Sequence, residues 1–116
     1  MAVKRFRGAD QPTNRSIVEG HRFTVTVVRF DAGSGRAGQW HHHGEHHLVA
    51  YIVAGTMQVE SGPGGSVVSH LEPGDLVHIE PHTVHRERYQ GHIELVGFSS
   101  GSGLGRVDVG MPDLVL

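Results

Sequence analysis

The sequence predicts an all-β fold in which short strands close into a sandwich or barrel. Three observations support this class: the 116-residue chain contains 17 glycines, it has several short runs of β-branched and aromatic residues, and no stretch has convincing helical periodicity. Glycine-rich turns that separate such runs at regular spacing are typical of all-β domains. A chain of this length is expected to form one domain that folds without covalent staples.

The first strand is expected within residues 18–30, where Phe23, Val25 and Val27 share one face. Residues 48–54 are almost continuously apolar and β-branched. That run is too short for a helix, so it predicts a buried strand. Alternation of side chains predicts that an apolar pocket in the barrel is lined by Val25, Val27, Val49, Tyr51, Val53, Val96 and Phe98.

Two strong turn signals divide the second half of the chain. They are Gly-Pro-Gly-Gly at 62–65 and Glu-Pro-Gly-Asp at 72–75, with proline where its fixed φ suits a turn and glycine where a positive φ is allowed. Around them, further strands are expected at residues 57–60, 66–71, 76–79, 85–89 and 93–99. The expected organisation is an N-terminal arm at 1–15, a barrel at 16–100 and a C-terminal tail at 101–116.

The composition argues against several partners and locations. The net charge is -2 with neutral histidines, and the only basic run, residues 4–7, is expected to be a solvated terminus, so no nucleic-acid partner is expected. The N-terminus lacks an apolar signal segment, and no run approaches membrane-spanning length, so we expect no membrane partner and a cytoplasmic location. The chain has no cysteine, so a metal must be held by histidine, carboxylate or water.

Five histidines lie within seven residues: His41, His42, His43, His46 and His47. Bringing imidazoles together is unfavourable once any of them is protonated, unless a metal holds them. In an extended segment, residues 41, 43 and 47 point to one side. We therefore expect a metal site formed by these three, with His42 and His46 facing outward or lying at a subunit contact. Trp40, which precedes them, is expected to pack under the loop.

This region resembles the first signature motif of the cupins, through Gly35, His41, His43, His47 and Gly55. Residues 74–85, which end in His85, resemble the second motif. The resemblance implies a small single-domain metal-binding cupin of the RmlC-like type, folded as a double-stranded β-helix or jelly roll. It also implies that the metal ligands are His41, His43, His85 and the residue at the family's carboxylate position.

The carboxylate position falls on His47 when the spacing from His43 is kept, and Glu45 remains an alternative. The predicted metal set is therefore His41, His43, His47 and His85. Such a nitrogen-rich set favours a divalent transition metal ion, Fe, Ni, Cu, Zn, Co or Mn, over Mg or Ca.

Two further side chains are candidates for catalysis. Glu87 lies two residues after His85, so it is expected to point inward, where it would orient a ligand histidine or act as a general base. Its alternative is a surface glutamate at a strand end. His82 is a candidate acid or base at the mouth of the barrel, with simple surface exposure as the alternative.

Three hypotheses for function follow. The first is a dioxygenase-like metalloenzyme that acts on a small organic molecule, and the second is an isomerase, lyase or polyketide-cyclase-type cupin. The third is a non-enzymatic ligand-binding or sensing protein with a structural metal. A homodimer is expected in each case, because jelly-roll edges need cover and the apolar residues 114–116 can dock on a partner subunit.

Overall fold

The computed structural model describes residues 3–5, 7–10, 15–19, 22–33, 37–101 and 105–112. These residues are almost entirely strand and turn, which confirms the predicted all-β class. The strands are β1 (Arg15–Glu19), β2 (Phe23–Asp31), β3 (His41–His42), β4 (Leu48–Ser61), β5 (Val67–Leu71), β6 (Leu76–Ile79), β7 (His85–Ser100) and β8 (Val107–Asp108). Single 3-10 turns occur at Gly8–Asp10 and Pro63–Gly65. In the described part of the chain, no helix has the length and apolarity needed to cross a membrane.

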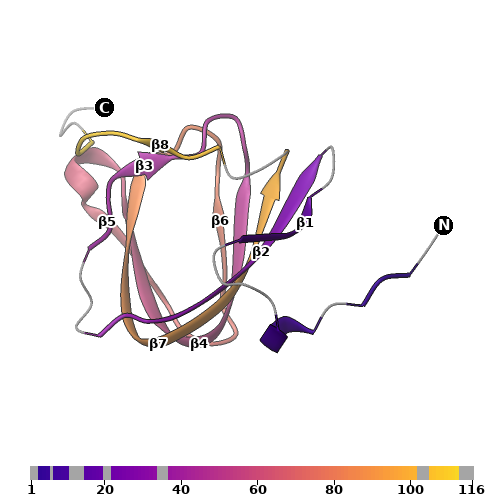
Figure 1. Ribbon diagram of the computed structural model, residues 1–116. Coiled ribbons are helices and arrows are strands. Elements are labelled where there is room, and N and C mark those ends of the chain that lie inside the picture. Colours follow the sequence, from indigo (N-terminus) through magenta and orange to yellow (C-terminus); the bar gives the residue numbers. More distant parts are fainter. Residues whose placement is uncertain are drawn as a thin grey trace.

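Strands β4 and β7 form the frame of the barrel. They pair with each other in antiparallel fashion over most of their length, and β7 also pairs with β2 and β3. The first part of β4 pairs with β6 and its second part with β5. In Figure 1 the two long strands curve side by side around one end of the barrel, while β3 and β8 cross the other end. This is the double-stranded β-helix that the sequence predicted.

The bend in β4 depends on a glycine. The pairing of β4 with β7 shifts register on both sides of Ala54, and Gly55 follows with φ of 80°. A Cβ atom at Gly55 would lie 2.4 Å from the carbonyl oxygen of His92. Both the positive φ and the close approach exclude a side chain here, as is typical of a β-bulge. The glycine that closes the first motif is therefore required by the curvature of the barrel.

The predicted lining of the barrel was wrong, because the predicted residues lie on its outer surface. Tyr51, Val53 and Phe98 are 45%, 47% and 50% exposed. The interior instead takes the residues of opposite parity, such as Ala50 and Ile52 in β4. The buried apolar core consists of Ala50, Ile52, Met57, Val59, Leu71, Ile79, Ile93 and Leu95. In β4 the error has a local cause: a turn at residues 44–45 interrupts the strand alternation that was carried forward from the histidines.

Six of the misplaced residues gather with Leu76 on one side of the sheet, here called the outer apolar face. In β2, β7, β4 and β6, Val25 pairs with Phe98 and Phe98 with Val49, and in the next row Val27, Val96, Tyr51 and Leu76 are neighbours. Four of these side chains are half-buried and three are exposed, Leu76 at 66%. A contiguous apolar face of this kind is typical of a surface that another protein covers.

We propose that a second copy of the chain covers the outer apolar face. Substituting Phe98→Glu would place a charge at its centre, so we expect a shift from dimer to monomer in size-exclusion chromatography with light scattering. The control is Val67→Glu, an equally exposed valine (52%) on β5, which is expected to leave the dimer intact. A monomeric wild-type protein would contradict this proposal.

Candidate metal centre

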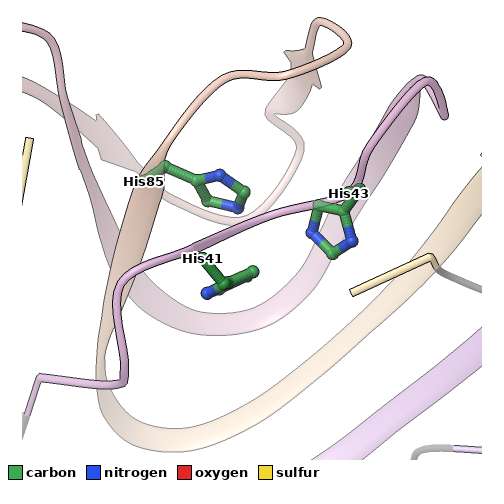
Figure 2. Close-up of side chains that lie close together, drawn as sticks. All are labelled: His41, His43 and His85. Atoms are coloured by element: carbon green, nitrogen blue, oxygen red, sulfur yellow. The ribbon is translucent and has the colours of Figure 1, made fainter. Parts of the chain in front are cut away.

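Three buried histidines meet inside the barrel. His41 lies in β3, His43 just after it, and His85 begins β7. Their ligand nitrogens all lie within 4.8 Å of one another, and Figure 2 shows the three rings turned toward a common point. The close approach of His41 and His85 follows from the sheet, because they are direct partners in the pairing of β3 with β7.

Backbone carbonyl groups orient two of the rings. The Nδ1 atom of His41 lies 2.7 Å from the carbonyl oxygen of Gln39, and the Nδ1 atom of His85 lies 2.9 Å from that of Thr83. A carbonyl oxygen only accepts hydrogen bonds, so each Nδ1 carries the proton. In the neutral ring Nε2 then has a free lone pair, which is the arrangement that metal-binding histidines show.

Glu87 places a carboxylate beside these nitrogens. Its Oε1 atom lies 3.2 Å from Nε2 of His85 and 3.6 Å from Nε2 of His41. The contact with His85 is an ion-pair contact without the alignment of a hydrogen bond. Glu87 is 14% exposed, and its position two residues after His85 puts it on the same face of β7. The cluster therefore offers three imidazoles and one carboxylate to a common point.

The cluster shifts the pKa values of its members in different directions. Burial lowers the pKa of His41, and the Glu87 charge only partly offsets this. Burial also opposes charging of His85, but the adjacent Glu87 carboxylate outweighs it and raises the pKa of His85. Burial alone would raise the pKa of Glu87, whereas His85 and the other histidines bring it below its usual value. Glu87 is therefore an anion that a cation at the common point would stabilise.

A cavity of about 380 Å³ opens beside the cluster. His41, His43 and Glu87 form part of its wall, and most of the remaining wall is apolar. The apolar lining residues come from β2, β4, β6 and β7 and are Val28, Phe30, Leu48, Ala50, Met57, Val77, Ile79 and Leu95. A cavity of this size and character holds a small organic molecule, with the histidine cluster at one wall.

The structure does not bring the predicted fourth histidine to the cluster. His47 is exposed, and its Nδ1 atom lies 2.9 Å from Nε2 of His78, with the two rings stacked on the outside of the barrel. The reason is the turn after His43, where Gly44 has φ of 58°. The turn ends the alternation, so residue 47 no longer shares a face with 41 and 43. The alternative candidate, Glu45, is exposed in the same turn.

His82 also lies away from the cluster. It is exposed, has φ of 60°, and donates its backbone N–H to the carbonyl oxygen of Gly44 at 2.7 Å. Its ring lies 6.1 Å from that of His42, and it is not part of the cavity wall. Nor does His46 join the cluster, since its Nδ1 atom lies 3.2 Å from Oγ of Ser99.

Trp40 anchors the chain immediately before His41. The indole is 6% exposed, as its predicted packing role requires, and the Arg86 guanidinium lies 4.5 Å from the ring centroid. Glu60 holds this arginine and Arg88 through two bonds of 2.6 Å to their Nε atoms. Gly65 also lies close to the ring, since a Cβ atom there would lie 2.5 Å from Cη2 of Trp40. The first ligand segment thus rests on a fixed aromatic ring.

Among the cavity residues that sequence analysis missed is a charged one, Arg106. It lies in the segment assigned to the tail, just before β8, which pairs with β3 so that Asp108 faces His41. Arg106 lines the same cavity as the histidines, and its Nε atom donates to Oδ1 of Asp108 at 2.9 Å. The alternation of Arg106, Val107, Asp108 and Val109 was a signal for a short strand, but the glycines around it favoured a linker.

Comparisons with known proteins agree with this architecture. Residues 4–111 match the family described as Mannose-6-phosphate isomerase C-terminal. No curated protein sequence matches the chain.

Among solved structures, the chain is similar to a protein with a double-stranded β-helix domain from Klebsiella pneumoniae subsp. pneumoniae (19% identity, 94% of this chain and 99% of that chain, TM-score 0.74). It is also similar to KdgF from Halomonas sp. (24% identity, 77% of each chain, TM-score 0.61). An RmlC-like cupin from Shewanella frigidimarina shares 25% identity over 71% of this chain and 68% of that chain, with a TM-score of 0.55. These likenesses support the jelly-roll fold.

Substituting Gly65→Ala tests the contact that holds Trp40. The new methyl group would collide with the indole, and φ of 73° would add backbone strain, so we expect a loss of about 2–4 kcal/mol in the free energy of unfolding. Gly74→Ala is the matched control, because φ is 95° but no atom lies within 4 Å of the new Cβ. It is expected to cost only about 1 kcal/mol. Equal losses in denaturant unfolding would show that the indole contact is unimportant.

The raised pKa of His85 is testable by NMR titration of the metal-free protein. We expect a value above 6.5 in the wild type and a clear fall in Glu87→Gln, because burial would then act without the carboxylate. A raised pKa means that, as long as Glu87 is ionised, the stabilising His85–Glu87 ion pair is complete below pH 6.5 and is lost as the pH rises through the folded-state value of His85. Glu45→Gln, an exposed carboxylate, is the control. An unchanged His85 titration in Glu87→Gln would contradict the assignment.

Proposed function

We propose, from the premise that the chain belongs to the Mannose-6-phosphate isomerase C-terminal family of cupin domains, that it is a metal-dependent enzyme acting on a small organic molecule. The observation that carries the proposal is the group of three buried histidines beside Glu87 at the wall of an apolar cavity. A structural site would need no such cavity.

The donor set fits a divalent transition metal ion. Two of the three imidazoles are held in the tautomer that leaves Nε2 available, and imidazole nitrogens with one carboxylate oxygen suit Fe, Mn, Co, Ni, Cu or Zn. We propose His41, His43, His85 and Glu87 as the ligands. In this assignment Glu87 takes the fourth ligand position, which the sequence spacing had assigned to His47 with Glu45 as the alternative.

The charge balance supports Glu87 as a ligand. Three neutral imidazoles leave a divalent ion with its full charge, and one carboxylate reduces the net charge of the centre to +1. Without a cation, Glu87 is a mostly buried anion. Its nearest partner is His85, which must be protonated to form an ion pair with it. An ion at the common point removes the need for that protonation, since metal ligands bind in their deprotonated form.

The remaining walls define what the protein contributes to a reaction. When bound, the ion supplies Lewis-acid polarisation of an oxygen atom of the substrate, or one-electron chemistry if it is redox-active. The apolar residues of β2, β4 and β6 exclude water from the space beside it and select an apolar substrate body. Oxygen-dependent cleavage is our leading reaction, and isomerase, lyase or cyclase chemistry at the same centre is the second.

A non-enzymatic ligand-binding or sensing protein is the remaining candidate. It predicts a closed coordination sphere of protein ligands only, whereas an enzyme keeps a position open to water or substrate. The cavity on one side of the cluster favours the open arrangement.

Elemental analysis of the purified protein tests the metal site. We expect one divalent ion per chain, lost or weakened by more than about 100-fold in His41→Ala and His85→Ala, and weakened by about 10-fold or more in Glu87→Gln. His47→Ala is the matched control, because it removes an imidazole from the same segment but from the outer surface, and it is expected to keep the ion. Stoichiometric metal in both the His41 and His85 variants would overturn the site.

A further inference from the structure

An arginine side chain lies at the mouth of the cavity beside the histidine cluster. Arg106 lines it together with His41, His43 and Glu87, and its side chain is 49% exposed, so it lies between the cavity and solvent. A ligand in the cavity can therefore reach this guanidinium.

The strand pairing holds Arg106 in place. Its segment is fixed to the ligand strand by pairing of His42 with Val107 and of His41 with Asp108. Asp108 accepts a hydrogen bond from Nε of Arg106, which orients the planar guanidinium. The two terminal nitrogens then present a pair of parallel donors, a geometry that matches the two oxygens of a carboxylate.

The cavity wall also carries a buried hydroxyl group among its apolar side chains. Thr26 in β2 is 4% exposed and lines the cavity, and its hydroxyl has no hydrogen-bond partner among the described residues. A buried hydroxyl without a partner costs free energy that a ligand can recover by bonding to it. The cavity is therefore built for a molecule that is apolar in its body and polar at more than one point.

The charges around the cavity distinguish between kinds of anion. A divalent ion with Glu87 and three neutral imidazoles has a net charge of +1, and Arg106 adds a second positive charge that Asp108 partly offsets. This balance suits a monoanion. A phosphate dianion would face the carboxylates of both Glu87 and Asp108, and the single guanidinium of Arg106 beside the ion would offset them less well than for a monoanion.

We propose that the cavity binds a small monocarboxylic acid with a hydroxyl or oxo group, that Arg106 is the specificity-determining residue for its carboxylate, and that Thr26 contacts its second polar group. The proposal rests on the proposed function, since it names the substrate class of the same site. Arg106 can nevertheless bind the carboxylate without contacting the metal, so its role can be tested separately from metal binding.

Calorimetric binding of matched probes tests the proposal. The probes are 2-hydroxybutanoate, 2-hydroxy-3-methylbutanoate and 2-hydroxyhexanoate, each with its primary amide and with the acid that lacks the hydroxyl; butyl phosphate is the phosphate probe. Titrations use the zinc-loaded and the metal-free protein. We expect at least one hydroxy acid to bind the wild type about tenfold or more tightly than its amide and more tightly than butyl phosphate.

The variants assign the preference to residues. In Arg106→Gln the acid-to-amide ratio of affinities is expected to fall by about tenfold, with partial retention in Arg106→Lys, which keeps the charge but not the paired donors. Arg5→Gln makes the same charge change on an exposed residue outside the cavity and is expected to keep the ratio. Thr26→Val is expected to lose the preference for the hydroxy acid over the unsubstituted acid.

The outcomes separate this proposal from the metal site. An unchanged acid-to-amide ratio in Arg106→Gln, or no acid that binds better than its amide, would overturn the role of Arg106. If butyl phosphate binds more tightly than the hydroxy acids, the cavity prefers a phosphate ester and the proposed carboxylate ligand is wrong. Absence of zinc binding would instead contradict the proposed function. The acid-to-amide ratios of the metal-free wild type and Arg106→Gln would still decide whether Arg106 binds a carboxylate in the cavity.

Discussion

The antiparallel pairing of β3 with β7 sets His41 opposite His85, and the candidate site depends on this single pairing. The two residues lie far apart in the chain, yet as direct partners their rings come within 4.3 Å between centroids. Alternation along β7 then carries Glu87 to the same side, and the carbonyl groups of Gln39 and Thr83 turn the rings so that Nε2 faces the common point. Long-range register brings the donors together, and local backbone geometry decides which nitrogen each one offers.

The support for this pairing lies on both sides of the site. Trp40 packs against both Gly65 and the Arg86 guanidinium, and Glu60 accepts a hydrogen bond from that arginine. On the far side, β8 extends the sheet beyond β3 and carries Arg106 to the cavity mouth. The strands that position the histidine cluster and those that form the cavity wall are thus parts of one sheet. This allows a small domain to hold the cluster beside an open cavity.

The turn at residues 44–45 explains why five neighbouring histidines have different roles. Before it, His41 and His43 share the inner face of an extended segment; after it, His47 lies outside against His78. A one-residue change of parity moves every later side chain to the other face of a strand. The same change placed Tyr51 on the outer apolar face and left Ala50 and Ile52 for the core.

The sequence alone determined the all-β class, the cupin motifs and the three histidines that cluster in the barrel, His41, His43 and His85, because turn chemistry, strand composition and motif spacing are local properties. It also pointed to Glu87, whose separation from His85 lies within one uninterrupted strand. The displacement of His47 from the cluster, the cavity lining and the place of Arg106 depended on tertiary structure. Alternation cannot be counted through a positive-φ turn, and a two-residue strand such as β8 is stabilised by its partner strand rather than by its own residues. Only the closed barrel decides which face is inside and which distant segment completes its mouth.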